Sequence, residues 1–174
     1  MTGGIGRVYL VGFMGAGKST VGRALALRLG VPFVDLDEAF EALAGMTIRR
    51  AFEERGEGWF REREAELLRG TASLPGAVVA LGGGTFTFPE NRAFVQRSGR
   101  SLFLDVPFEV IAARLSGKAA DRPLFRSVED ARALFEARLA SYRLSDRILA
   151  LEGDERVDAV VDRIVGAMNV QSCA

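Results

Sequence analysis

The segment GFMGAGKST, from Gly12 to Thr20, constrains this chain more than any other. It follows the apolar run Val8–Val11 and opens a stretch with helical periodicity, which is the setting that a phosphate-binding P-loop requires. Its glycines let the backbone curl around phosphate oxygens, and the new helix adds the positive end of its dipole. Lys18 can reach the β- and γ-phosphates, and Ser19 can ligate magnesium. A turn that binds nothing is the weaker interpretation, so the segment predicts a nucleoside triphosphate site.

Composition narrows the class of protein. Acidic and basic residues balance at 23 each, which gives no indication of a nucleic-acid groove or an anionic membrane as partner. No apolar run approaches the roughly 20 residues that span a bilayer, and Met1–Arg7 does not read as a signal peptide. The single cysteine, Cys173, fits a reducing compartment. The chain has no histidine, so carboxylates, lysines and arginines remain as the working groups.

Apolar runs and helical patterns alternate along the chain. We expect strands at Val8–Val11, Pro32–Leu36, Ala77–Leu81, Ser101–Asp105 and Ile148–Leu151. We expect helices at Lys18–Leu29, Asp37–Ala44, Ile48–Arg55, Gly58–Arg69, Pro89–Ser98, Pro107–Ser116, Val128–Leu144 and Arg156–Met168. Continuous apolar runs are typical of parallel strands covered on both faces. The alternation predicts one α/β domain whose ligands collect at the carboxyl ends of its strands.

Two polar or glycine-rich segments follow predicted strands. Asp35 and Asp37 close the second strand, where one could hold a metal-bound water and the other a substrate hydroxyl. The alternative is that one of them caps the next helix, with Asp37 the better candidate. The triplet Gly82–Gly84 indicates either a sharp turn or a close approach to the backbone. No carboxylate ends that strand, so metal binding falls to Ser19 and Asp35.

For each of two charged segments the sequence allows two interpretations. The run from Gly56 to Glu64 could be an exposed helix laced with salt bridges, or Arg61 beside Phe60 could reach into a pocket. The small polar segment from Ser116 to Leu124 could be a surface loop, or a lid that brings Arg122 onto a transferring phosphoryl group.

Taken together, these segments resemble the shikimate kinases, small P-loop kinases of the nucleoside-monophosphate-kinase type. The resemblance runs from about Val8 to Tyr142 and rests on GFMGAGKSTVGRALA, FVDLDEAFE, F-x-x-x-G-E-x-x-F-R-x-x-E from Phe52 to Glu64, LGGG, and the DRPL that ends at Leu124. It implies an α/β, three-layer P-loop fold with a five-stranded parallel sheet flanked by helices and a mobile lid. It also implies a single domain over residues 1–174, with a substrate-binding helical region at about 37–69 and a lid at about 116–127.

The resemblance also implies roles for particular residues. ATP would be bound by Gly12, Gly15, Ala16, Gly17, Lys18, Ser19, Thr20, Arg114 and Arg122, and Mg²⁺ by Ser19 and Asp35. Shikimate would be bound by Asp37, Phe52, Phe60, Arg61, Gly82, Gly83, Gly84 and Arg138. Lys18, Asp37 and Arg122 would be catalytic, and Arg61 and Arg138 would pair with the substrate carboxylate. Arg143 is the alternative to Arg138, because this chain lacks the proline and leucine of the family's R-x-P-L-Y context. The loop after Leu151 also departs from the family, because it lacks a proline.

The implied reaction transfers the γ-phosphoryl group of ATP to the 3-hydroxyl of shikimate, in aromatic amino-acid (chorismate) biosynthesis. The implied protein is a cytoplasmic monomer with small-molecule substrates and with neither nucleic acid nor membrane as partner. One alternative is another small-molecule kinase of the same fold, such as a gluconate kinase. Another is a catalytically silent ATP-binding regulatory module. A nucleoside-monophosphate kinase fits less well, because it needs a base pocket and several phosphate-binding arginines on the acceptor side.

Overall fold

A five-stranded parallel sheet forms the centre of the molecule. The computed structural model describes residues 6–115 and 127–169 of the chain. The strand order is β2-β3-β1-β4-β5, and every neighbouring pair is parallel. The strands are β1 (Arg7–Val11), β2 (Phe33–Asp35), β3 (Ala77–Ala80), β4 (Gly99–Asp105) and β5 (Arg147–Ala150). The expected five-stranded parallel sheet is confirmed, and each strand begins and ends within two residues of the expected position.

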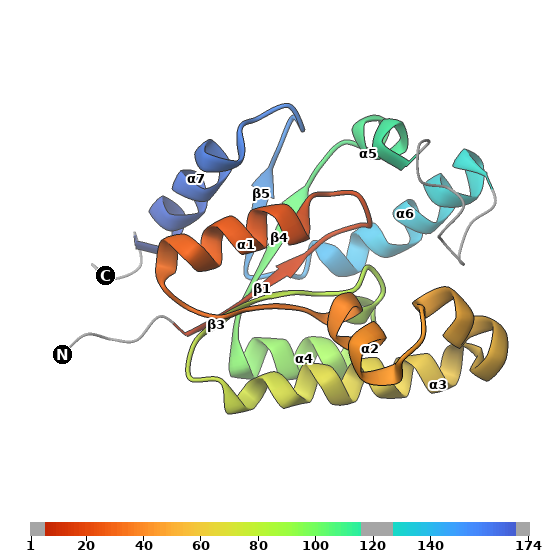
Figure 1. Ribbon diagram of the computed structural model, residues 1–174. Helices are drawn as coiled ribbons and strands as arrows, with labels where there is room; N and C mark the ends of the chain where they lie inside the picture. Colours follow the sequence, from red (N-terminus) through yellow and green to blue (C-terminus); the bar gives the residue numbers. More distant parts are fainter. Residues whose placement is uncertain (1–5, 116–126, 170–174) are drawn as a thin grey trace.

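Helices cover the sheet on both faces and complete the three layers. They are α1 (Lys18–Leu29), α2 (Leu36–Ala44), α3 (Ile48–Gly70), α4 (Pro89–Ser98), α5 (Phe108–Leu115), α6 (Val128–Tyr142) and α7 (Val157–Asn169). Two short 3-10 helices, η1 (Thr71–Ser73) and η2 (Thr85–Thr87), flank β3. Helices α1 and α7 pack together on one face, and α3 and α4 lie on the other (Figure 1). No helix in the described part of the chain is long and apolar enough to cross a membrane.

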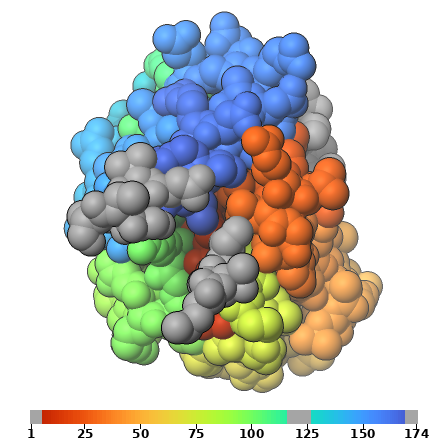
Figure 2. Space-filling model, turned by 90° about the vertical axis from the view of Figure 1, so that its left-hand side faces the viewer, coloured from red at the N-terminus to blue at the C-terminus, as the bar shows by residue number. Residues whose placement is uncertain are grey.

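The main core lies between the sheet and these helices. β3 is buried along its whole length, as a central strand covered on both faces should be. The edge of the sheet at which the strands begin is enclosed from both faces, by α1 and α7 on one side and α4 on the other (Figure 2). A site can therefore form at the opposite end of the sheet, in the loops that follow the carboxyl ends of the strands.

Helix α2 and the first part of α3 lie toward the carboxyl ends of the strands, and the rest of α3 runs back along the sheet beside α4 (Figure 1). A second apolar cluster of Phe40, Ala51 and Phe60 joins α2 to α3. The two helices expected at 48–55 and 58–69 are one element, α3, interrupted at Gly56, whose φ of 83° and ψ of 163° lie outside the helical region. The interruption changes the direction of the helix just before Glu57, and it therefore sets where the residues after it point.

Candidate active site

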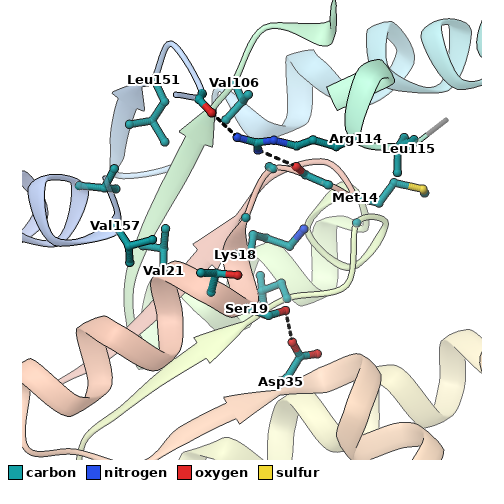
Figure 3. Close-up of a pocket in the computed structure, with 18 of the residues that line it drawn as sticks. Met14, Lys18, Ser19, Val21, Asp35, Val106, Arg114, Leu115, Leu151 and Val157 are labelled. Atoms are coloured by element: carbon teal, nitrogen blue, oxygen red, sulfur yellow. Dashed lines mark hydrogen bonds between the residues drawn. The ribbon is translucent and has the colours of Figure 1, made fainter. Parts of the chain in front are cut away.

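The P-loop connects the central strand β1 to α1. Gly15 and Gly17 adopt φ values of 80° and 94°, a left-handed conformation that suits glycine, and Gly17 caps α1. The ammonium group of Lys18 lies over the loop and donates hydrogen bonds to the carbonyl oxygens of Gly12 at 2.8 Å and Phe13 at 3.0 Å. Figure 3 shows this amine in the cleft beside the loop. The loop thus holds one positive charge at the place where phosphates would bind.

Ser19 and Asp35 meet at the same end of the sheet. The hydroxyl of Ser19 donates to Oδ2 of Asp35 at 2.5 Å (Figure 3). The other oxygen of Asp35 accepts from the backbone N–H groups of Asp37 at 3.0 Å and Glu38 at 3.3 Å and so caps α2. The interpretation that favoured Asp37 as the cap was wrong. Because α2 begins one residue earlier than expected, Asp37 stands in its first turn and faces the cleft.

A pair of oxygen ligands beside a phosphate loop suits Mg²⁺, which keeps several waters and takes one or two protein ligands. The hydroxyl of Ser19 and the carboxylate of Asp35 are such a pair, and both line the cleft with Lys18. Within residues 6–115 and 127–169 no group of three or more acidic or cysteine side chains gathers to hold a metal. The donor set therefore fits a nucleotide-bound magnesium ion rather than an all-protein cage.

Arg61 lies in an enclosed position on the second half of α3. Its side chain is 13% exposed, and its guanidinium carbon lies 5.8, 5.0 and 5.5 Å from the ring centres of Phe52, Phe60 and Phe88. Such distances are those of cation–π contacts. The salt-bridged helix expected as one alternative is present, because Arg61 also pairs with Glu57 at 3.1 Å, and the three aromatic rings enclose the same arginine.

Glu64 fixes Arg61 from the buried side. Its carboxylate is 2% exposed and accepts from Nη1 of Arg61 at 2.9 Å and from the hydroxyl of Thr85 at 2.6 Å. This tie joins α3 to η2, the short helix after β3. Glu64 ends the motif that begins at Phe52, but the sequence alone indicates no role for it, and it indicates none for Thr85. The one indication in the sequence that Glu64 pairs with Arg61 is its position three residues later on the same helix.

The second arginine, Arg138, comes from α6. It is 8% exposed, and its Nη1 has no hydrogen-bond partner among the described residues. Tyr142, one helical turn later, donates to the carbonyl oxygen of Gly83 at 2.5 Å. Burial raises the pKa of Tyr142 to about 12, so its hydroxyl keeps the proton that it donates. Arg143, the alternative, is exposed at the end of α6.

The triplet Gly82–Gly84 brings these groups together. A Cβ atom on Gly82 would lie 2.9 Å from Oδ1 of Asp37, one on Gly83 would lie 3.2 Å from Nη1 of Arg138, and one on Gly84 would lie 2.8 Å from Nη1 of Arg61. A side chain at Gly82 or Gly84 would therefore require these groups to shift, and one at Gly83 would press on Arg138. Both interpretations of the triplet hold, because side chains approach its backbone closely and the N–H group of Thr85 donates to the carbonyl oxygen of Gly82 at 3.1 Å in a tight turn. Gly82 thus borders the carboxylates of Glu64 and Asp37, and Gly83 and Gly84 border Arg138 and Arg61.

One cleft of about 580 Å³ runs along this edge of the sheet. At one end it is lined by Asp35, Asp37 and Gly83, in the middle by Gly15 to Thr20, and at the other end by apolar side chains after β4 and β5. Those apolar side chains are Val106, Leu115, Leu151, Val157 and Val160, several of which appear in Figure 3. The shape and chemistry suit phosphates in the middle and a flat, apolar base at one end.

Arg114 closes the apolar end of the cleft. Its guanidinium donates to the carbonyl oxygens of Gly15 at 2.9 Å and Gly153 at 2.5 Å, and so links the P-loop to the loop after β5 (Figure 3). Glu155 orders that second loop. Its carboxylate accepts from the N–H groups of Glu152 at 2.8 Å and Gly153 at 2.7 Å, and these backbone hydrogen bonds lower its pKa. Sequence reasoning did not single out Glu155.

The structure thus lines one cleft with the expected ATP-side residues Gly15 to Thr20 and Arg114, whereas Gly12 lies behind the loop against the backbone of Leu104. On the acceptor side Asp37 and Gly83 line that cleft, whereas Arg61 and Arg138 lie behind them against the glycine triplet. Arg122 and nearly all of the lid expected at 116–127 lie outside the described residues.

The site combines three features: a phosphate loop after the central strand, an apolar slot on one side of it and a charged pocket on the other. This combination is typical of P-loop kinases that phosphorylate small molecules, and the fold and the site place the protein in that class. The family model of shikimate kinase matches residues 14–169. The chain belongs to the shikimate kinase family.

Individual relatives agree with this assignment. A shikimate kinase of Salinibacter ruber is 41% identical, over 95% of this chain and 86% of the relative. One of Geobacter sulfurreducens is 42% identical, over 89% of this chain and 87% of the relative. Among solved structures, a shikimate kinase from Acinetobacter baumannii in complex with shikimate is 32% identical, has a TM-score of 0.91 and matches over 98% of this chain and 96% of its own.

Proposed function

We propose that this protein transfers the γ-phosphoryl group of ATP to the 3-hydroxyl of shikimate, giving ADP and shikimate 3-phosphate for aromatic amino-acid (chorismate) biosynthesis. The observation that carries the proposal is the glycine triplet, which borders Asp37, Arg138 and Arg61 in succession at the end of the phosphate cleft. Two enclosed guanidinium groups suit one planar carboxylate, and a carboxylate between them and the P-loop suits a hydroxyl acceptor.

The P-loop side positions the donor. Backbone N–H groups and Lys18 would hold the β- and γ-phosphates, with Gly12, Gly15, Ala16, Gly17 and Thr20 shaping the loop around them. Ser19 and Asp35 would hold Mg²⁺, which when bound neutralises charge on the β- and γ-phosphate oxygens. Arg114 would lie against the base, which would enter the apolar slot between Val157 and Leu151.

The acceptor side positions the nucleophile. Asp37 would accept a hydrogen bond from the attacking hydroxyl, orient it toward the γ-phosphorus and take its proton as the new P–O bond forms. Phe52 and Phe60 would wall the ring of the substrate, and N–H groups of the triplet would contact it. Arg122 would add charge opposite the transferred group once a lid over about 116–127 closes and excludes water.

The remaining expectations concern the setting of the enzyme. We propose a monomer that acts in the cytoplasm on ATP and shikimate, with neither nucleic acid nor membrane as a partner. Balanced charge and a single cysteine support this setting.

The test is ADP release with ATP and magnesium in the presence of shikimate, gluconate or AMP. Shikimate-dependent release is expected. Release with gluconate or AMP instead, or with none of the three from protein that binds ATP, would refute the proposed acceptor.

Arg61→Ala tests the acceptor pocket, with Arg63→Ala as its control. Arg63 lies on the same helix and pairs with Glu66 at 2.6 Å, but its side chain is 44% exposed. Losing two enclosed charge-assisted hydrogen bonds of about 1.5 kcal/mol or more each should lower kcat/KM for shikimate by at least about 100-fold. Affinity for ATP should not change, and Arg63→Ala should behave as wild type. Normal turnover of Arg61→Ala would show that the pocket is wrongly assigned.

A further inference from the structure

Arg61 already binds two carboxylates of its own chain. Its Nη1 donates to Glu64, and its Nε and Nη2 both donate to Oε1 of Glu57, at 3.2 and 3.1 Å. The Nε and Nη2 groups form one of the edges with which a guanidinium grips a carboxylate by two parallel hydrogen bonds. An acceptor carboxylate that binds Arg61 by this edge meets Glu57 there. One that binds elsewhere on the guanidinium still has the negative charge of Glu57 beside it.

The two glutamates differ in how firmly they are held. Glu64 is 2% exposed and is tied to Thr85 as well as to Arg61. The side chain of Glu57 is 55% exposed and uses a single oxygen for both contacts. A carboxylate that is half in water regains its hydration when it swings out, so its ion pair contributes little and is easily exchanged. Glu57 is therefore the partner that can leave.

The break at Gly56 gives Glu57 its position. Because the φ of 83° at Gly56 interrupts α3, Glu57 begins a new helical segment, and Arg61 follows one turn later on the same face. Arg138 provides the contrast within the same pocket: it is buried, and its Nη1 has no hydrogen-bond partner among the residues that the structure describes. One nitrogen of Arg138 thus lacks a partner among the described residues, whereas the guanidinium of Arg61 is paired with two carboxylates.

From these contacts we infer that Glu57 is a resident competitor of the substrate: its carboxylate occupies Arg61 in the empty protein and is displaced by the carboxylate of the acceptor. The inference rests on the proposed function, because it specifies how the pocket of that reaction selects its acceptor. Glu57 acts through Arg61 and lowers affinity for every acceptor carboxylate, while it keeps the enclosed arginine paired between turnovers. A neutral acceptor would leave Glu57 in place.

The experiment compares wild type, Glu57→Gln and the control Glu53→Gln with two acceptors, at saturating ATP and magnesium. Glu53 is on the same helix, is 60% exposed and pairs with Arg49 at 3.0 Å, four residues earlier. Glutamine keeps the shape of the side chain and a hydrogen-bond acceptor but removes the charge. The acceptors are shikimate and its methyl ester, which keeps the ring hydroxyls and lacks the negative charge.

Glu57→Gln should lower KM for shikimate by about 2- to 5-fold, which is the range expected for an exposed ion pair. KM for the ester should not fall, because nothing in that complex competes with Glu57, and KM for ATP should not change. Glu53→Gln should match wild type with both acceptors. The ratio of kcat/KM for shikimate to that for the ester should therefore rise in Glu57→Gln alone.

Three results would overturn the inference: an unchanged or higher KM for shikimate in Glu57→Gln, an equal fall for the ester, or an equal fall in Glu53→Gln. A higher KM would mean that Glu57 orients Arg61 for the substrate instead of competing with it. Wild-type protein without shikimate-dependent ADP release would instead refute the proposed function, so the two failures are distinguished by the wild-type measurement.

Discussion

Replacing Glu64 with glutamine should destabilise the protein far more than the same change at Glu57, although both residues pair with Arg61. Glu64 is 2% exposed and accepts from two donors, Arg61 at 2.9 Å and Thr85 at 2.6 Å. A glutamine side chain has only one acceptor oxygen. Whichever way it turns, its NH₂ group faces either the guanidinium or the hydroxyl, and one donor in the buried site loses its partner.

The magnitude follows from these contacts. A charge-assisted hydrogen bond contributes about 1.5–3 kcal/mol, and a buried donor without a partner costs about 1–3 kcal/mol. Arg61 keeps its second partner, Glu57, which holds the loss below that of an isolated buried pair. We expect the free energy of unfolding to fall by about 2–4 kcal/mol, which for a domain of this size lowers Tm by about 5–15 °C. Glu57→Gln, at a side chain 55% exposed, should cost no more than about 1 kcal/mol.

The assay is urea unfolding of the three proteins, with free energies from linear extrapolation and slopes compared to verify two-state behaviour. Equal losses in the two variants would refute the reasoning, because burial would then not govern the strength of these pairs. A loss in Glu64→Gln of less than about 1 kcal/mol would refute it as well, since the tie between α3 and η2 would then contribute little.

Two further predictions concern the ATP side of the cleft. Arg114→Ala removes the link from Gly15 to Gly153 and should raise KM for ATP by at least about 5-fold, which corresponds to about 1 kcal/mol. KM for shikimate should stay the same. An unchanged KM for ATP in steady-state kinetics would contradict this prediction. Glu155 has a pKa below its usual 4.5, so it stabilises the fold above that pH and loses this contribution as pH falls through its lower folded pKa. Glu155→Gln should therefore be less stable than wild type in urea at pH 7, and the difference should shrink as the pH falls below 4.5; a difference that stays constant as the pH falls would contradict it.

Local patterns predicted the elements whose ends are marked by particular residues. The helix Lys18–Leu29 was predicted to the residue, because Gly17 and Gly30 adopt left-handed conformations at its two ends. Pro89 likewise marks the start of α4. Strand ends depend on pairing between distant segments, so their positions were predicted less accurately. Gly99 begins β4 because it pairs with Arg7, and nothing near Gly99 in the sequence indicates this partner.

The candidate site was predicted in its parts but not in its connections. Motifs identified Lys18, Asp37 and Arg61, whereas the buried role of Glu64 depends on Thr85, a residue 21 positions away on another element. The choice of Asp35 over Asp37 as the cap of α2 depends on where that helix begins, and the sequence pattern fixed this start only to within one residue.

The strand order has a consequence for how specificity can change. Asp37, Arg61, Glu64 and the glycine triplet all lie between β2 and η2, one uninterrupted stretch of chain. The proposed ATP side is built from segments before and after that stretch, and among the described residues α6 brings Arg138 and Tyr142 to the triplet while Phe88 contacts Arg61 from beyond η2. A single exchange of this stretch between two kinases of the fold would carry almost a whole acceptor site with it. New acceptors can therefore arise by recombination while the phosphate donor stays the same.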